Sequence, residues 1–129
     1  MLNNVQPHGY LALPPTGKGQ PVLVLHAWWG LNDTMKAFCT RLASAGFVAF
    51  APDLYHGKIA DTIADAETFS DALDPGQAKA DIVAATIFLS QHSGQGDRGL
   101  AVIGFSLGAY YALDLSATHP EHIGILFDF

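Results

Sequence analysis

The sequence predicts an α/β domain: a mainly parallel sheet with helices on both faces. Short, continuous apolar runs, which are typical of strands covered on both faces, alternate along the chain with longer segments of helical periodicity. In addition, half of the 129 residues are apolar and only 14% are charged, so one small domain has a large core to bury. Alternation of this kind is typical of parallel sheets connected by helices.

The composition excludes several classes of protein. Six Lys and Arg residues against twelve Asp and Glu residues give a net charge of −6, which argues against binding to nucleic-acid phosphates. A single cysteine cannot form an internal disulfide, and no apolar stretch reaches the roughly 20 residues that span a bilayer. Residues 1–20 lack the basic start and apolar core of a signal peptide. We therefore expect a cytoplasmic protein with no nucleic-acid or membrane partner.

The first half of the chain predicts three strands and a helix. Residues 8–14 predict a short edge strand that ends at a proline pair, and residues 21–26 and 47–51 predict buried strands. Asn32 is a good helix N-cap and Gly46 a good helix end. Between them, apolar side chains recur at helical spacing: Met35, Phe38, Cys39, Leu42 and Ala43.

The second half predicts more helices and strands. Residues 59–73 are rich in Ala and Asp and predict a short helix or an irregular segment. Asp74 and Pro75 begin a longer helix that ends near Ser93. The remaining elements are a polar turn over 95–99, a buried strand over 100–105, a helix over 107–118 and a last buried strand over 123–129.

A Gly-x-Ser-x-Gly pattern, from Gly104 to Gly108, lies between a predicted strand and a predicted helix. In that context the pattern holds the Ser106 hydroxyl above the sheet, on a strained turn at a helix N-terminus. A Cβ atom at either glycine would clash where strand and helix approach each other. The Leu107 N–H can then form half of an oxyanion hole. The pattern thus predicts a nucleophilic serine, the alternative being a Gly-rich turn with a surface serine.

Three segments in the right order resemble the dienelactone hydrolase family of α/β-hydrolases: Leu25-His-Ala-Trp-Trp-Gly-Leu-Asn32, Ala51-Pro-Asp-Leu-Tyr55 and Gly104-Phe-Ser-Leu-Gly-Ala109. The resemblance covers about residues 8–129 and implies the N-terminal portion of an α/β-hydrolase fold. It also implies cleavage of small carboxylic esters or lactones through an acyl-Ser106 intermediate. Ser106 matches the family's nucleophile position, and Trp28 and Leu107 match the positions whose backbone N–H groups form the oxyanion hole.

Two departures from the family pattern go together. The best-known members carry Cys in Gly-x-Cys-x-Gly-Gly, where this chain has Ser106 and Ala109, and they carry Glu where this chain has Ala27. A thiol beside a carboxylate needs its protonation controlled, whereas a serine relies on a neighbouring base. The chain therefore resembles a serine branch of the family, whose substrate need not be a dienelactone.

The acid and the histidine of the family's catalytic triad follow the last strand of this chain. We therefore expect residues 1–129 to form an incomplete α/β-hydrolase domain that lacks both groups. Removing triad members typically costs several orders of magnitude in rate. We expect the isolated chain to be nearly inactive.

Other residues are weaker candidates for the base or the acid. His119 and His122 follow a helix of about a dozen residues, which places them roughly 18 Å from the serine. His26 matches a structural loop position and is expected to be a satisfied histidine. His56 lies in a loop at the same end of the sheet. Asp128 ends the strand after the serine, where some α/β-hydrolases, but not this family, place their acid.

The sequence also predicts which residues line a substrate pocket and whether a cofactor is bound. Trp29, Tyr55 and His56 follow strand ends and are predicted to line a pocket for an apolar acyl or ring group; the alternative is that the tryptophan packs over the sheet. The histidines are scattered, and Cys39 lies on the buried face of its helix as a packed core thiol. No set of residues has metal-ligand spacing, so no metal or other cofactor is expected.

Two other functions stay open. The chain could be a non-catalytic half-domain that acts as a binding or assembly module, by self-association or with a complementary chain at the open sheet edge formed by residues 123–129. An acyltransferase or thioesterase on the same fold is the other alternative. The motif around Ser106 favours the hydrolase, because a binding module needs no nucleophile.

Overall fold

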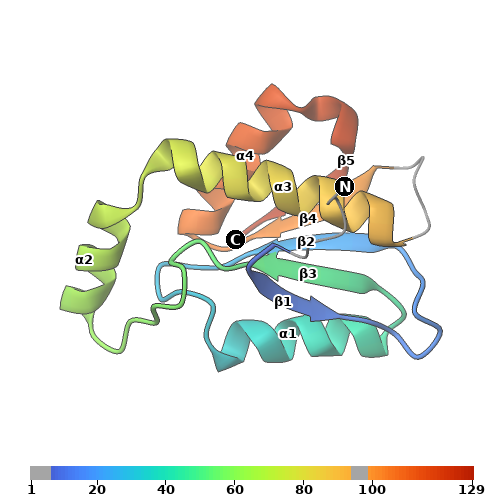
Figure 1. Ribbon diagram of the computed structural model, residues 1–129, viewed down its shortest axis with the longest axis horizontal. Helices are drawn as coiled ribbons and strands as arrows, with labels where there is room; N and C mark the ends of the chain where they lie inside the picture. Colours follow the sequence, from blue (N-terminus) through green and yellow to red (C-terminus); the bar gives the residue numbers. More distant parts are fainter. Residues whose placement is uncertain (1–6, 94–98) are drawn as a thin grey trace.

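The computed structural model describes residues 7–93 and 99–129, and within them five strands form one sheet (Figure 1). The strands are β1 (Gly9–Ala12), β2 (Pro21–Leu25), β3 (Val48–Pro52), β4 (Leu100–Gly104) and β5 (Ile123–Asp128). Their order across the sheet is β1-β3-β2-β4-β5. All neighbours are parallel except β1, which pairs antiparallel with β3 at one edge. The predicted mainly parallel sheet is confirmed.

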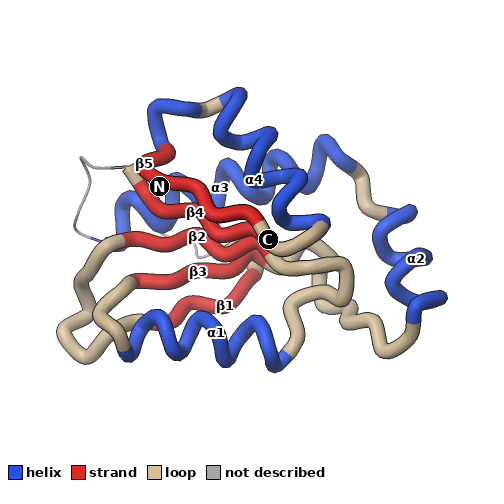
Figure 2. The backbone as a smooth tube through the Cα atoms, turned by 180° about the vertical axis from the view of Figure 1, so that it is seen from behind, coloured by secondary structure: helices blue, strands red, loops and turns tan. Residues whose placement is uncertain are grey.

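Helices cover both faces of this sheet, as Figures 1 and 2 show. α1 (Asp33–Ser44) lies on one face, and α3 (Pro75–Ser93) and α4 (Leu107–Thr118) lie on the other. α2 (Ile63–Ala72) projects beyond the carboxyl ends of the strands (Figure 1). A short 3-10 helix, η1 (Pro120–His122), connects α4 to β5.

The core has two parts, one on each face of the sheet. β2 and β3 are buried along their whole length because both of their faces are covered. Leu23 and Phe50 pack toward α3 and α4. Val24 and Ala49 pack toward α1, together with the fully buried Cys39. Cys39 is therefore a packed core thiol, as predicted.

Side chains fix the helix starts where the sequence predicted them. Asn32 Oδ1 accepts a hydrogen bond from the Met35 N–H (3.1 Å), and Asp74 Oδ2 accepts one from the Gln77 N–H (3.0 Å). The uncertain segment over 59–73 contains a regular helix, α2, which begins after Thr62. The predicted polar turn falls largely on residues 95–98, which lie outside the described residues.

The prediction that residues 123–129 form a buried strand is wrong in one respect. The strand forms and pairs with β4, but Ile125, Phe127 and Phe129 are 51%, 44% and 73% exposed. β5 is the outermost strand of the described sheet, and α1 packs against β1 and β3 at the other side. Nothing in the described residues covers β5 on the α1 side, so its apolar side chains face solvent. Within residues 7–93 and 99–129, no strand pairs with the outer edge of β5.

Candidate active site

The candidate site lies at the topological switch point of the sheet, the place where the strand order changes sides. The strand that follows β2 in the sequence, β3, lies on one side of β2, and β4 lies on its other side. In open α/β sheets, ligands bind at the carboxyl ends of the strands that flank such a point. Two loops meet there, residues 27–31 after β2 and the turn around Ser106 after β4. The Phe105 N–H donates a hydrogen bond to the Leu25 carbonyl oxygen (3.1 Å) and joins the two strand ends.

Ser106 occupies the turn between β4 and α4 in an unusual backbone conformation. Its φ is 56° and its ψ is −108°, values that residues with a side chain rarely adopt. Such a conformation costs about 1–3 kcal/mol. The side chain is exposed and makes no capping hydrogen bond to α4. The hydroxyl is therefore not used to cap the N-terminus of this 12-residue helix.

The two glycines of the motif allow the close approach that the sequence predicts. A Cβ atom on Gly104 would lie 2.6 Å from the Gly108 carbonyl oxygen and 2.8 Å from the Ala109 Cα. One on Gly108 would lie 2.6 Å from the Leu25 carbonyl carbon and 2.7 Å from the His26 carbonyl oxygen. All these neighbours are backbone atoms, which cannot rotate away. The predicted steric reason for both glycines is confirmed.

Backbone N–H groups are available beside the serine. Leu107 is the first residue of α4, so its N–H has no partner within the helix. Trp28 lies on the neighbouring loop, which follows the strand paired with β4. The motif assigns the Leu107 N–H to an oxyanion hole, and the family resemblance implies both donors. Their role as oxyanion donors stays a prediction.

His26 holds the start of the 27–31 loop. Its side chain is fully buried; Nδ1 lies 2.8 Å from the Ala27 carbonyl oxygen, and Nε2 lies 3.1 Å from the Leu54 N. Because a carbonyl can only accept and a backbone N–H can only donate, the imidazole is neutral with its proton on Nδ1. Burial also lowers the pKa of His26 below its ordinary value. His26 is thus the satisfied loop histidine that the sequence predicts.

The sequence around this site matches a known protein family. The model of the Dienelactone hydrolase family matches residues 8–125, which include the 27–31 loop, the loop after β3 and the turn around Ser106. The chain belongs to the dienelactone hydrolase family.

Relatives in this family are similar over nearly the whole chain. A putative carboxymethylenebutenolidase from Aquifex aeolicus is 35% identical over 129 residues, a match that covers 94% of this chain and 54% of the relative. A carboxymethylenebutenolidase from Pseudomonas sp. is 34% identical over 119 residues, covering 84% of this chain and 49% of the relative. The crystal structure of a putative dienelactone hydrolase from Klebsiella pneumoniae superimposes with a TM-score of 0.75 at 25% identity, covering 88% of this chain and 50% of that one. The chain spans about half the length of these relatives.

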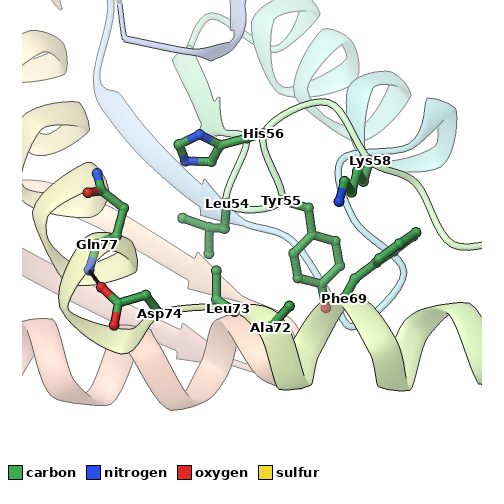
Figure 3. A pocket seen from close by; sticks show the side chains of 9 residues that line it. All are labelled: Leu54, Tyr55, His56, Lys58, Phe69, Ala72, Leu73, Asp74 and Gln77. Carbon is green, nitrogen blue, oxygen red and sulfur yellow. Dashed lines mark hydrogen bonds between the residues drawn. The ribbon is translucent and has the colours of Figure 1, made fainter.

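A cavity of about 250 Å³ lies between the loop after β3, α2 and the start of α3 (Figure 3). Tyr55 and His56 line it, whereas Trp29, Trp28 and Ser106 do not. Trp29 is instead 37% exposed on the 27–31 loop, with its ring edge-on to Trp28. The whole lining is Leu54, Tyr55, His56, Lys58, Phe69, Ala72, Leu73, Asp74 and Gln77.

The histidines that the sequence offered as alternative bases lie in other surroundings. His56 Nε2 is 2.7 Å from Asp81 Oδ2 on α3, and the His56 ring stacks on His8 next to β1. His119 follows the last residue of α4, at the opposite end of the helix from Ser106. Asp128, the one acidic residue of β5, pairs with Gly104 across β4 and β5, two residues before the serine.

Residues 7–93 and 99–129 hold neither a candidate metal site nor a candidate membrane span. No group of three or more His, Cys, Asp or Glu side chains is placed to hold a metal ion in these residues. No helix among them is long and apolar enough to cross a membrane.

Proposed function

We propose that this chain carries the nucleophile and the oxyanion hole of a serine hydrolase that cleaves small carboxylic esters or lactones. The observation that supports this most is the backbone of Ser106, held at φ 56° between two glycines at the switch point of the sheet. A costly conformation is retained where it serves a function. The family and the names of its carboxymethylenebutenolidase members support the substrate class.

In the proposed reaction, Ser106 Oγ attacks the carbonyl carbon of the ester and its proton passes to a base. The Trp28 and Leu107 N–H groups donate to the oxygen that becomes negative. The tetrahedral intermediate expels the alcohol, which takes the proton back from the base, and water then hydrolyses the acyl-Ser106 ester. The positive end of the α4 dipole also favours the negative charge that develops there.

The base and the acid are proposed to lie outside residues 1–129. His26 is neutral and has both ring nitrogens engaged, and His56 follows β3, which β2 separates from β4, the strand that leads into Ser106. The chain spans about half of its relatives, and the family resemblance assigns the acid and histidine to the other half. We propose that this chain is the N-terminal part of the catalytic domain, with a cytoplasmic location that fits its unpaired, buried cysteine.

A second candidate function rests on the open edge of the sheet. Ile125, Phe127 and Phe129 expose apolar surface beside the outer edge of β5. Such an edge favours pairing with another strand. The alternative is therefore a half-domain that assembles through β5, with a second copy or with a complementary chain.

Labelling with a fluorophosphonate probe, read by intact mass, tests the hydrolase proposal. In the form extended past Phe129 we expect one adduct, on Ser106, which is lost in Ser106→Ala and retained in Ser116→Ala, a serine on α4 whose hydroxyl donates to the Leu113 carbonyl oxygen of the same helix. The chain alone should label little. The chain is measured alone and in a form extended past Phe129. Labelling of the extended form only would mean that the base lies beyond this chain. Absence of labelling in both would overturn the nucleophile assignment and favour the assembly module.

A further inference from the structure

We propose that Tyr55 is a positioning residue for the oxyanion hole, acting through the backbone of Trp28. This inference rests on the proposed function and adds a residue to it. Tyr55 Oη donates a hydrogen bond to the Trp28 carbonyl oxygen (2.8 Å), across 27 residues of sequence. Trp28 is the residue whose own N–H is proposed to bind the oxyanion.

Packing holds the Tyr55 side chain independently of that hydrogen bond. It is 6% exposed, and its ring lies edge-on to His26 (5.1 Å between centroids) and to Phe69 on α2 (5.9 Å). Figure 3 shows the ring beside Phe69 at one side of the cavity. The Tyr55 N–H donates to Asp53 Oδ1 (3.2 Å) within the turn after β3. A side chain packed in this way loses little conformational entropy when its hydroxyl bonds the loop.

Both peptide planes around Trp28 are therefore held. The Trp28 N–H belongs to the same rigid peptide plane as the Ala27 carbonyl, which His26 Nδ1 (2.8 Å) and the Gly30 N–H (3.1 Å) bond. The Trp28 carbonyl belongs to the next plane, and Tyr55 bonds it. Only two dihedral angles, φ and ψ of Trp28, connect these planes. The bonds to the Ala27 carbonyl hold the plane that contains the Trp28 N–H, and the Tyr55 bond limits rotation about the φ and ψ angles of Trp28 that connect it to the next plane.

Close packing of the two loops supports the same conclusion. A Cβ atom on Gly30 would lie 2.8 Å from the Lys58 carbonyl oxygen and 3.2 Å from Tyr55 Cδ2. The Ala60 N–H also donates to the Trp29 carbonyl oxygen (3.0 Å). The 27–31 loop thus rests on the segment after β3, and Tyr55 is the side chain of that segment that reaches the Trp28 backbone. Burial raises the pKa of Tyr55 to about 12, so the hydroxyl remains a donor at physiological pH.

Trp28 has a second anchor that acts on its side chain alone. Its indole N–H donates to Ser70 Oγ on α2 (2.9 Å). Loss of this bond frees the indole ring but leaves both carbonyl bonds in place. The two anchors can therefore be separated by mutation: Tyr55→Phe releases the backbone, and Ser70→Ala releases the side chain.

The test compares Tyr55→Phe with Tyr10→Phe and Ser70→Ala. Tyr10 is a matched control, because its hydroxyl also makes one hydrogen bond, to Thr40 Oγ1 (2.9 Å), on the α1 side of β1. Fluorophosphonate labelling of Ser106 is followed over time at several probe concentrations, in the form that labels in the wild type. Amide hydrogen exchange is measured for residues 27–31, and urea unfolding reports stability.

We expect Tyr55→Phe to slow the maximal labelling step about tenfold to a hundredfold, with the half-saturating probe concentration unchanged, because the loss is in the transition state. Exchange should become faster at the Trp28 and Trp29 amides. Tyr10→Phe, of similar stability, and Ser70→Ala should label at close to the wild-type rate.

Two failures are distinguishable. Wild-type labelling at Ser106 that Tyr55→Phe does not slow, with unchanged exchange at Trp28, would overturn this inference and leave the proposed function standing. A wild-type protein that does not label, even when extended past Phe129, would overturn the proposed function and the positioning role with it. Equal slowing by Tyr10→Phe would also overturn the inference, because it would trace the effect to general stability.

Discussion

Gly108 packs directly against Leu25, so that the first turn of α4 lies on the end of β2. A Cβ atom on Gly108 would lie 2.6 Å from the Leu25 carbonyl carbon, far inside the contact distance of real side chains. We expect Gly108→Ala to lower the free energy of unfolding by about 1–3 kcal/mol, because the helix must move off the strand. Urea unfolding at 25 °C measures this difference.

Gly76→Ala is the matched control for that substitution. Gly76 also lies in the first turn of a helix, α3, but a Cβ atom there meets only Asp74 Oδ2 at 3.5 Å, an ordinary contact. This variant should be as stable as the wild type or more stable by up to about 1 kcal/mol, because alanine favours the helix. If both variants had the same stability as the wild type, the close approach of α4 and β2 would be wrong.

The buried His26 makes stability depend on pH in a definite direction. Its pKa in the folded protein is lowered by burial, so protonation favours the unfolded chain. The stability that neutral His26 contributes is fully present above its unfolded pKa of about 6.5 and is lost as the pH falls below it, down to the folded pKa. We expect the urea midpoint to decrease between pH 7.5 and pH 5.

His26→Asn identifies the source of that decrease. The variant should be less stable at pH 7.5, because it disturbs the bonds to Ala27 and Leu54, but its midpoint should change less between the two pH values. His92→Asn, at an exposed position on α3, should keep the wild-type pH dependence. An unchanged pH dependence in His26→Asn would contradict the assignment.

Local signals explain why so much of this fold is predictable. The N-caps Asn32 and Asp74, the buried runs of β2 and β3, and the glycines around Ser106 each depend on a few neighbouring residues, and all are found as expected. Gly-x-Ser-x-Gly is informative because the two glycines of the pattern are the positions at which a Cβ atom would collide with neighbouring backbone atoms. The turn can therefore be predicted before any tertiary contact is known.

Long-range contacts are the part that the sequence does not reveal. The bonds from Tyr55 to Trp28 and from Trp28 to Ser70 join residues 27 and 42 positions apart, and no periodicity links them. The exposure of β5 cannot be predicted from the sequence for a related reason. An apolar run indicates a strand that favours burial, but only the neighbouring elements determine whether something covers Ile125 and Phe127.

The exposed face of β5 predicts concentration-dependent association of this chain. Phe127 is 44% exposed beside an unpaired strand edge in the described sheet. We expect Phe127→Lys to shift the chain toward the monomer in sedimentation velocity across a range of concentrations, because a charged side chain on an edge strand opposes pairing. Leu113→Lys, at a 54% exposed site on α4, should have little effect. Equal effects of the two variants would point to general solubility instead of the β5 edge.

The strained turn predicts a trade of stability against function at Ser106. Ser106→Ala keeps a Cβ atom at φ 56° and loses no capping hydrogen bond, so its stability should remain close to that of the wild type. Ser106→Gly relieves a strain of about 1–3 kcal/mol, partly offset by the roughly 0.5–1 kcal/mol of extra backbone entropy that glycine loses on folding. The glycine variant should therefore unfold at a higher urea concentration than the alanine variant. If the alanine variant unfolded at the higher urea concentration, the turn would not be strained. The main physical reason for assigning Ser106 as a nucleophile would then be lost, because an unstrained turn could carry a serine for no functional purpose.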